Sequence, residues 1–204
     1  MEHGRVNALD EKLGNLFAIS PVQRSKDLEA AGIARVELTR AVAAGTIKRL
    51  SRGVYSLADF RESEHGALAL VAEKAPESII CLLSALSYHD LTTQAPFEVW
   101  IALASKAWIP KMAYPSLRIT RFGGESLAYG VMTELIDGVV VKVTTIEKTI
   151  TDCFKYRTKV GLDVALEALR EAGRVGRLDR DALWACAKVD RVTTVILPYM
   201  EALA

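Results

Sequence analysis

Helical spacing of apolar residues marks the first patterned segment of the chain, at about residues 8–19. The apolar positions that recur three or four residues apart are Leu9, Leu13, Leu16 and Phe17. This period predicts an amphipathic helix. Ser20-Pro21 ends it, because the residue before a proline is pushed out of the α region. A second, short helix is predicted to start at the N-cap residue Ser25 and to end at Gly32, where a left-handed turn favours glycine.

A third helix and a β-hairpin follow this glycine turn. The helix is predicted from about residue 34 to residue 44, and Gly45 ends it. The residues expected to make its apolar contacts are Val36, Leu38 and Val42. Two strand-like segments at residues 47–50 and 54–57 then flank the turn Ser51-Arg52-Gly53, which predicts a hairpin.

The order helix, helix, glycine turn, helix and hairpin predicts a winged helix-turn-helix domain at residues 1–60. In such a domain the third helix can enter the major groove of DNA, and the hairpin is the wing. Residues 58–64 form a short polar junction. Residues 61–204 are predicted to form a second domain of mixed α/β structure, so the fold class of the chain is α+β.

Helical and strand-like segments also alternate in this second domain. Thr144 and Glu147 have the spacing of a capping box, which predicts that a helix begins there and runs to about Tyr156. The other helices are predicted at about residues 65–75, 78–90, 161–173, 179–188 and 192–203. Strands are predicted at about residues 97–103, 117–122, 127–136 and 139–144. Asp137-Gly138 suits the turn of the last hairpin.

Basic residues are concentrated in the N-terminal domain. The whole chain has a formal net charge of only +1, whereas residues 22–56 contain seven basic and three acidic residues, a net charge of +4. This excess is what an electrostatic footprint for double-stranded DNA requires. The residues predicted to bind bases or phosphates are Arg35, Thr39 and Arg40 of the third helix and Lys48, Arg49 and Arg52 of the wing. The alternative is a basic three-helix scaffold that binds no DNA.

Two further charged groups of residues have an open interpretation. Glu37 lies on the third helix and is expected to pair with Arg35 or Arg40 rather than to bind cytosine. A second basic cluster lies near the predicted helix that ends at Tyr156, and its members are Lys148, Lys155, Arg157 and Lys159. This cluster is either a surface for an acidic partner or RNA, or the solvated polar face of an amphipathic helix.

No constellation of residues predicts catalysis. Ser84 and His89 are five positions apart on one predicted helix and so face different directions, and Asp90 points elsewhere. The chain contains no nucleophile elbow, P-loop or dinucleotide-binding glycine motif and no histidine pair at metal-ligand spacing. We therefore expect no enzyme activity, no metal and no cofactor.

The remaining conspicuous residues are expected to lie in the core. The three cysteines, Cys81, Cys153 and Cys186, are far apart among apolar residues, which indicates reduced thiols. Core packing is also the expected role of the aromatic residues Trp100, Trp108, Trp184 and Tyr199. No apolar run approaches the roughly 18 residues of a membrane span, and no signal peptide is apparent at the N-terminus, so a cytoplasmic protein is expected.

The segment from Leu28 to Tyr55 resembles the opening domain of the AbiEi antitoxin family. The matching motifs are Gly32-Ile33, Gly45 and Arg52-Gly53-Val54-Tyr55. In the second domain, Ser84-Ala85-Leu86 and His89-Asp90-Leu91-Thr92, followed by Pro96, are similar to a Ser-Ala-Leu…Gly-Leu-Thr segment of that family, with Asp90 at the glycine position. Thr144 to Asp152 is similar to its Thr-x-x-Glu-Arg-Thr…Asp segment, with Lys148 at the arginine position.

This resemblance implies the regulator half of a bacterial abortive-infection, type IV toxin–antitoxin pair that takes part in phage defence. Its N-terminal domain would bind inverted repeats upstream of its own operon and repress it. Its C-terminal domain would neutralise a toxin of the nucleotidyltransferase fold. Repression would need two or more copies on the DNA, such as a homodimer, because one such module contacts too little sequence for strong specificity.

Two other functions remain open at this stage. One is a stand-alone transcription regulator whose C-terminal domain senses a small molecule or dimerises. The other is a metal-dependent nuclease, which needs clustered carboxylates with a nearby lysine. Its candidate residues are Asp137, Glu147 and Lys148.

Overall fold

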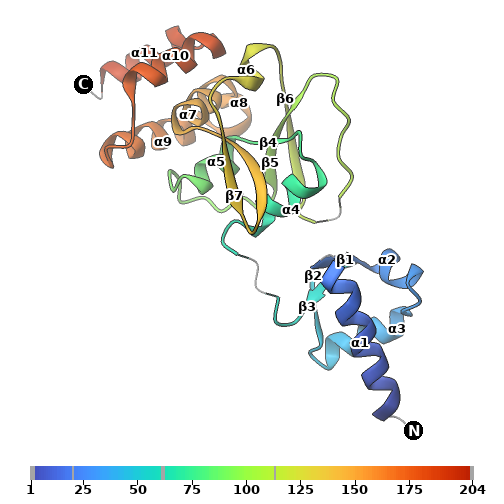
Figure 1. The fold of residues 1–204 in the computed structure, drawn as a ribbon. Helices are drawn as coiled ribbons and strands as arrows, with labels where there is room; N and C mark the ends of the chain where they lie inside the picture. The colour runs from blue at the N-terminus through green and yellow to red at the C-terminus, as the bar shows by residue number, and fades with distance from the viewer. Residues whose placement is uncertain (1–2, 20, 61–62, 113, 203–204) are drawn as a thin grey trace. The chain divides into compact units, whose positions relative to one another are not determined.

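The chain folds into two compact units, Met1–Glu62 and Ser63–Ala204, and each is described by itself. The computed structural model describes residues 3–19, 21–60, 63–112 and 114–202 (Figure 1). Helices and sheets are present in both units, which confirms the predicted α+β fold class. No helix in the described parts of the chain is long and apolar enough to cross a membrane.

The N-terminal unit combines three helices with a small antiparallel sheet (Figure 1). Its elements are α1 (His3–Ile19), β1 (Val22–Arg24), α2 (Ser25–Ala30), α3 (Arg35–Ala43), β2 (Ile47–Ser51) and β3 (Val54–Leu57). The strand order is β1-β3-β2, so the predicted hairpin gains a third strand that the sequence did not predict. Three residues are too few to show a period, and β1 forms because its backbone pairs with β3.

The core of this unit lies between the three helices and one face of the sheet. The buried residues that form it are Leu13, Phe17, Leu28, Ile33, Leu38, Ala41 and Ile47. On α3 the buried pair is Leu38 and Ala41, three positions apart. Of the three residues predicted to make apolar contacts on α3, Leu38 is buried, whereas Val36 and Val42 are 56% and 37% exposed. The outer face of α3 is therefore partly apolar.

The C-terminal unit is a mixed five-stranded sheet in the order β6-β5-β4-β8-β7, with helices on both faces (Figure 1). Its strands are β4 (Ile79–Ile80), β5 (Val99–Ala104), β6 (Leu117–Phe122), β7 (Val131–Ile136) and β8 (Val139–Thr144). Its helices are α4 (Gly66–Lys74), α5 (Leu82–Tyr88), α6 (Glu125–Ala128), α7 (Ile146–Lys155), α8 (Arg157–Val160), α9 (Leu162–Arg174), α10 (Arg180–Asp190) and α11 (Thr193–Glu201). Strands β5 and β6 are parallel, as are β4 and β8.

Alternate residues of β5 belong to two different cores. Trp100 and Ala102 pack with α5, α7, α9, α10 and α11 on one face of the sheet. Val99, Ile101 and Leu103 pack with α4 on the other face. This alternation is the period of two that a strand buried on both faces shows.

The sequence prediction is wrong for residues 78–90, which form a strand and a helix rather than one helix. The chain pairs as β4, and Cys81 donates its N–H to the carbonyl of Trp100 at 3.1 Å. Leu82 has φ of 49°, and α5 begins there. A short, wholly apolar run carries no period by which a strand and a buried helix can be distinguished. The four-residue helices α6 and α8 were also not predicted.

The helix α7 begins one residue later than the capping-box prediction implies. Thr145 is the N-cap, and its Oγ1 accepts the N–H of Lys148 at 3.3 Å. Thr144 is instead the last residue of β8, and its hydroxyl lies 2.6 Å from that of Thr149. Both residues are threonines, so local spacing alone does not decide between them.

Candidate nucleic-acid interface

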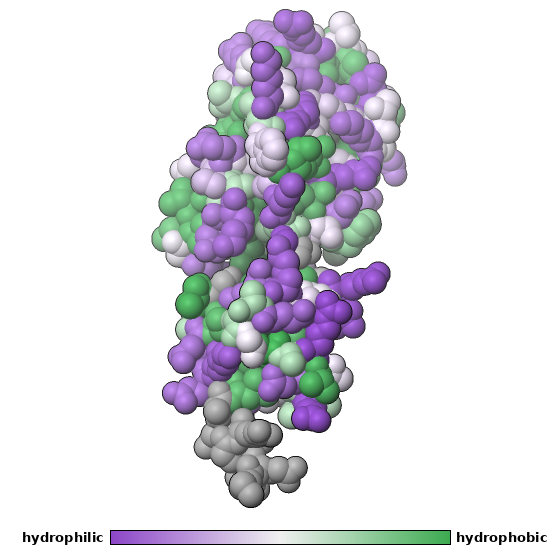
Figure 2. All heavy atoms as spheres, turned by 90° about the vertical axis from the view of Figure 1, so that its right-hand side faces the viewer, coloured by the Kyte–Doolittle hydropathy of each residue, from purple (hydrophilic) through white to green (hydrophobic). Residues whose placement is uncertain are grey.

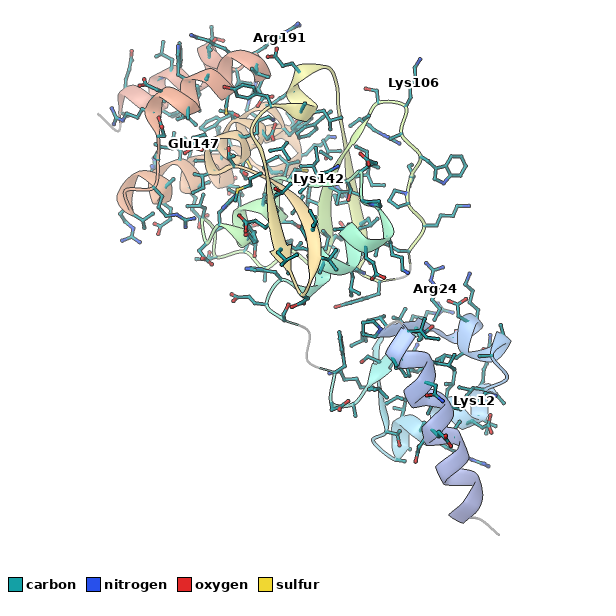
Figure 3. The ribbon with its side chains drawn as sticks, in the orientation of Figure 1. Lys12, Arg24, Lys106, Lys142, Glu147 and Arg191 are labelled. Atoms are coloured by element: carbon teal, nitrogen blue, oxygen red, sulfur yellow. The ribbon has the colours of Figure 1, made fainter. Side chains whose placement is uncertain are left out.

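The helix-turn-helix turn holds α3 so that one face points to solvent. Gly32 has φ of 82°, the left-handed region that favours glycine, and Ile33 directly after it is buried. The Nζ atom of Lys12 donates to the carbonyl of Gly32 at 3.3 Å, which ties α1 to the turn. Figure 3 shows Lys12 on α1 and Arg24 at the end of β1. The exposed residues on α3 include Arg35, Val36, Thr39 and Arg40.

Arg35, at the start of α3, is held by an ion pair with α2. Its Nε donates to Oε1 of Glu29 at 2.6 Å, while the Arg35 side chain stays 81% exposed. This hydrogen bond and the charge of Glu29 raise the pKa of Arg35 above its ordinary value. Because Glu29 contacts Nε, both Nη groups can still donate to a guanine edge or a phosphate.

Glu37 caps the helix instead of pairing with an arginine. Its Oε2 accepts the backbone N–H of Ala34 at 2.7 Å, at the positive end of α3. The prediction that Glu37 pairs with Arg35 or Arg40 is therefore wrong, since Arg35 pairs with Glu29. The carboxylate is engaged at the helix end, so it is poorly placed to accept a hydrogen bond from a cytosine.

Thr39 and Arg40 lie one turn further along the exposed face. The Thr39 hydroxyl donates to the carbonyl of Arg35 at 3.1 Å. Its proton is therefore used within the helix, and its oxygen can accept a hydrogen bond from a base. Arg40 is exposed in the last turn of α3. Val36, which was predicted to make apolar contacts, joins this face and could contact a thymine methyl group.

The three cations of the wing do not share one orientation. Lys48 pairs with Ser56 across the hairpin and Arg49 with Tyr55, so successive side chains point to opposite faces of the sheet. Arg49 is exposed on the face of Tyr55, which packs against the core beneath α3. Lys48 is half-buried, and its Nζ donates to the carbonyl of Phe60.

The tip of the wing is fixed to the start of α2. Gly53 has φ of 74°, and its carbonyl accepts the backbone N–H of Ser25 at 2.8 Å. A Cβ atom at this glycine would lie 3.2 Å from Oγ of Ser25, so the turn and α2 are in close contact. Arg52 is exposed at this tip. Arg40, Arg49 and Arg52 are therefore exposed cations on elements that pack together as one module.

The second basic cluster does not form one surface, and Lys148 is the clearest correction. Its side chain is completely buried, with Nζ bonded to Oδ1 of Asp152 and 3.2 Å from Oδ2 of Asp190. The same Nζ lies 4.8 Å from the centroid of the Phe122 ring. Neither a partner surface nor a solvated helix face is available to Lys148 in this fold.

Two buried carboxyl groups share the charge of this lysine, and their environments differ. Burial alone would raise the pKa of Asp190, but Lys148 and hydrogen bonds from Ser126 and Thr151 hold it below its ordinary value. Burial raises the pKa of Asp152 well above its ordinary value despite Lys148. Within the described part of the chain, Oδ2 of Asp152 has no hydrogen-bond partner. The network therefore stabilises the ionised form of Asp190 more than that of Asp152.

The other members of the second basic cluster are only partly available. Nζ of Lys155 donates to Oγ of Ser126 at 2.8 Å and lies 3.2 Å from Oδ1 of Asp190, which draws it into the buried network. Arg157 and Lys159 are exposed on α8. Nη1 of Arg157 donates to the carbonyl of Phe154 at 3.0 Å. Only these two cations remain candidates for a partner surface.

The residues considered for catalysis have structural roles. Ser84 Oγ accepts the N–H of Trp100 at 2.9 Å, and Nε2 of His89 lies 2.7 Å from the carbonyl of Thr144. Burial lowers the pKa of His89, so its ring is the neutral form that can donate to this carbonyl. The three cysteines are free and buried, as predicted.

The candidate nuclease residues do not converge either. Asp137 accepts a hydrogen bond from Ser63 at 2.5 Å, whereas Glu147 accepts the N–H of Asp179 at 3.3 Å. Lys148 bonds to neither. No cluster of three histidine, cysteine or acidic side chains suited to a metal ion occurs among the described residues.

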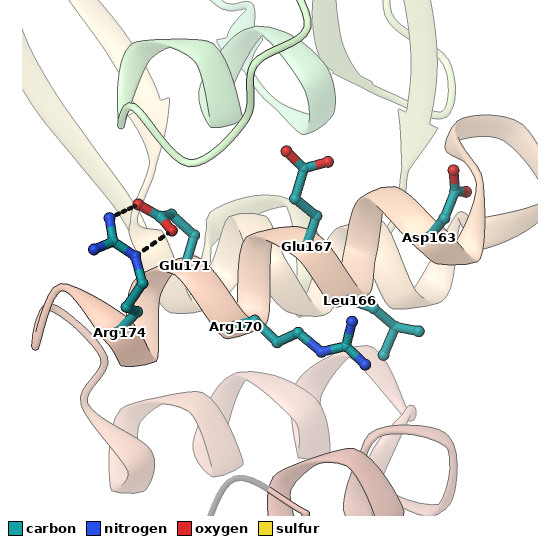
Figure 4. A pocket seen from close by; sticks show the side chains of 6 residues that line it. All are labelled: Asp163, Leu166, Glu167, Arg170, Glu171 and Arg174. Atoms are coloured by element: carbon teal, nitrogen blue, oxygen red, sulfur yellow. Dashed lines mark hydrogen bonds and ion pairs between the residues drawn. The ribbon is translucent and has the colours of Figure 1, made fainter.

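The helix α9 carries a mixed charged face in the C-terminal unit. The residues along it are Asp163, Leu166, Glu167, Arg170, Glu171 and Arg174 (Figure 4). Glu171 and Arg174 form an ion pair at 2.6 Å on this face, which is drawn as dashed lines in Figure 4. Because three acidic side chains and two basic ones lie there, the face has no strong attraction for a polyanion.

Topology and exposed cations together place the N-terminal unit in the class of winged helix-turn-helix modules. Residues 21–58 match the family model described as "Transcriptional regulator, AbiEi antitoxin", so the resemblance noted in the sequence is confirmed for this segment. The match covers the helix-turn-helix and the wing and supports a DNA-binding regulator.

The fold is similar to that of a solved structure over most of the chain. The crystal structure of the RV2827C protein from Mycobacterium tuberculosis has a TM-score of 0.54 and 11% sequence identity. The alignment covers 86% of this chain and 69% of that chain. At this identity the likeness concerns the fold alone. No curated protein matches the sequence.

The two departures from the expected family motifs have different physical settings. Asp90 has φ of 57°, in the left-handed region where glycine is favoured, which explains why a glycine suits this position. Lys148 occupies the position expected for arginine and is a buried cation between two carboxyl groups. The motif from Thr144 to Asp152 therefore maintains the core.

Proposed function

We propose that the chain is a transcriptional regulator that binds double-stranded DNA upstream of its own operon and represses it, acting by binding rather than by catalysis. The observation that carries this proposal is the exposed face of α3, with Arg35, Thr39 and Arg40, on the same module as the exposed wing cations Arg49 and Arg52. The third helix would read base edges in the major groove while the wing binds phosphates.

The geometry ranks the contributions of the individual residues. Arg40 and Arg35 would discriminate between base sequences, each by about 1–3 kcal/mol. Arg49 and Arg52 would neutralise phosphates and give salt dependence. Lys48 would contribute less, because its Nζ is already bonded to Phe60.

The experiment is a binding titration of the full chain with labelled upstream DNA and with an unrelated duplex, at two salt concentrations. We expect preferential binding that salt weakens. Arg40→Ala should remove most of the preference, and Arg52→Ala should reduce the salt slope by about one. Arg170→Ala, on the mixed face of α9, is the matched control. Equal affinity for both duplexes would overturn the proposal.

A second part of the proposal is that the regulator is the antitoxin of a type IV pair and counters a nucleotidyltransferase-fold toxin. The family match at residues 21–58 supports it. Since Lys148 and Asp152 are buried, the toxin would be countered through other residues, and Arg157 and Lys159 are the exposed candidates. Co-expression with the neighbouring gene tests it: growth arrest that this chain does not relieve would contradict the antitoxin role.

The resemblance also predicts an operator made of inverted repeats and more than one copy on the DNA. Two copies related by a two-fold axis would match such a site. The mass of the complex on a single operator, measured by light scattering, decides between one copy and two.

A further inference from the structure

The connection between β5 and β6 runs along an edge of the C-terminal sheet. These strands are parallel, with Val99 opposite Leu117 and Ala104 opposite Phe122, so the chain must return over the length of the sheet. We call residues 105–116 the crossover loop. Its described residues contain no helix or strand. Figure 1 shows the chain passing beside β6, which is the edge strand.

The crossover loop is anchored at several points, although it is irregular. Nη1 of Arg121 donates to the carbonyls of Ala104 and Ala107, at 2.6 and 2.8 Å. The side chains of Ala107 and Met112 pack against the core on the α4 face of the sheet. The residues between these anchors are therefore held in position at the surface.

Two large apolar side chains between these anchors point outward. Trp108 is 82% exposed and Ile109 is 51% exposed. The prediction that Trp108 packs in the core is therefore wrong, whereas Trp100 is buried as predicted. The two adjacent exposed apolar side chains on this anchored loop form a candidate contact surface.

Basic residues predominate around Trp108. Residues 99–124 contain four basic residues and no acidic residue. Lys106 and Lys111 are exposed on either side of Trp108-Ile109-Pro110, and Figure 3 shows Lys106 extending outward from the loop. On β6, the side chain of Arg118 is 56% exposed, and its Nη1 lies 3.9 Å from Oε2 of Glu98, the residue just before this segment. The side of the unit that carries the loop faces the viewer in Figure 2, where hydrophobic patches lie among hydrophilic side chains.

We propose that the crossover loop is a second DNA-binding surface, which rests on the proposed function of the chain as a DNA-binding regulator. Lys106 and Lys111 bind phosphates, and Trp108 and Ile109 contact the groove between them. Apolar residues flanked by cations are used in this way by proteins that bind the minor groove. A polyanion suits a loop in which Lys106 and Lys111 flank the apolar pair and the loop itself contains no acidic residue.

The winged module makes this second contact effective even if it is weak alone. Once α3 and the wing hold the DNA, the covalently joined loop meets it at a raised effective concentration. The described residues of the loop form no helix that could enter a major groove as α3 does. It therefore adds affinity and extends the protected DNA without changing the preferred sequence.

The test measures affinity and salt slope of the full chain on operator DNA with long flanks and on the same operator without flanks. On the long duplex, the double variant Lys106→Ala/Lys111→Ala should lower the salt slope by about two, since each phosphate contact contributes about 0.9. Trp108→Ala should weaken binding about tenfold on the long duplex and leave the short one unchanged. The matched controls are Arg170→Ala, a surface cation on α9, and Leu135→Ala, an apolar side chain 71% exposed on β7.

The outcomes separate this inference from the proposed function. If the wild-type chain binds the operator and the loop variants match it on both duplexes, the second surface is wrong and the regulator stands. An equal loss in Leu135→Ala would also overturn it, because the effect would then be general. If the wild-type chain shows no preference for the operator, the proposed function fails and this inference fails with it. Unchanged thermal unfolding of each variant shows that the fold is kept.

Discussion

The Nζ atom of Lys148 lies 3.2 Å from Oδ2 of Asp190, and neither side chain is exposed to solvent. Asp190 is the last residue of α10, whereas Lys148 is in the first turns of α7. The contact therefore joins two helices through a charge pair inside the C-terminal unit. A buried pair of this kind is most sensitive to the loss of one partner.

Removal of the lysine should destabilise the C-terminal unit strongly. Lys148→Ala leaves Asp152 and Asp190 buried without their common cation, and the expected cost is about 3–5 kcal/mol. Urea unfolding, monitored by circular dichroism, measures this loss in the free energy of unfolding. Lys159→Ala, on the exposed surface of α8, is the control and should change stability little. A loss for Lys148→Ala no larger than that of the control would contradict the buried network.

His89 should make stability depend on pH. Burial depresses its folded-state pKa below the ordinary value of 6.5, so the folded protein binds fewer protons than the unfolded chain. Its contribution to stability is present above about pH 6.5 and is lost as the pH falls through the folded-state pKa. Urea midpoints at about pH 7.5 and about pH 5 should show this decrease. His89→Gln keeps a donor for Thr144 and should have a smaller decrease.

Glu29 should restrain DNA binding by α3. It is the only ion-pair partner of Arg35 among the described residues, and it places a negative charge beside the proposed interface. Glu29→Gln should strengthen binding to any duplex and make it more sensitive to salt, because phosphates no longer compete with a carboxylate. Affinity measured at two salt concentrations tests this. Equal or weaker binding by the variant would show that the ion pair orients Arg35 for DNA.

Two neighbouring apolar residues of α3 should behave in opposite ways. Leu38 is 1% exposed, and Leu38→Ala should cost about 2–5 kcal/mol through the cavity it leaves. Val36 is 56% exposed, and Val36→Ala should change stability by about 0.5 kcal/mol or less. The same variant should alter the preference of the protein for thymine-containing sites. Unfolding and binding measured on both variants would reveal a reversed assignment of the two faces.

The N-terminal module could be predicted from its sequence because its signals are local. Gly32, Gly45 and Gly53 all have positive φ, and each lies where the sequence predicted a turn. The hairpin strands likewise follow directly from the residues on either side of Gly53. What the sequence missed is the inward face of α3, since Val36, Leu38 and Val42 are chemically alike and only packing distinguishes them.

The C-terminal unit depends more on contacts between distant residues. The burial of Lys148 is decided by Asp190, 42 positions later, and no local pattern contains that information. Ile79 and Ile80 form a strand because β5 and β8 pair with them. In the crossover loop, Ala107 and Met112 pack against the core, whereas Trp108 is exposed. In each case the side-chain type was compatible with two environments.

The bond between the wing turn and α2 has a consequence for how specificity can change. A backbone hydrogen bond between Ser25 and Gly53 joins the wing turn to α2, and the buried residues Leu38 and Ala41 pack α3 against the core. The outward side chains of α3 take little part in either task. Base-reading residues can therefore be exchanged on an unchanged scaffold. The module is thus a natural starting point for designing new DNA-binding specificities, and related chains could diverge in their target sequence while keeping one fold.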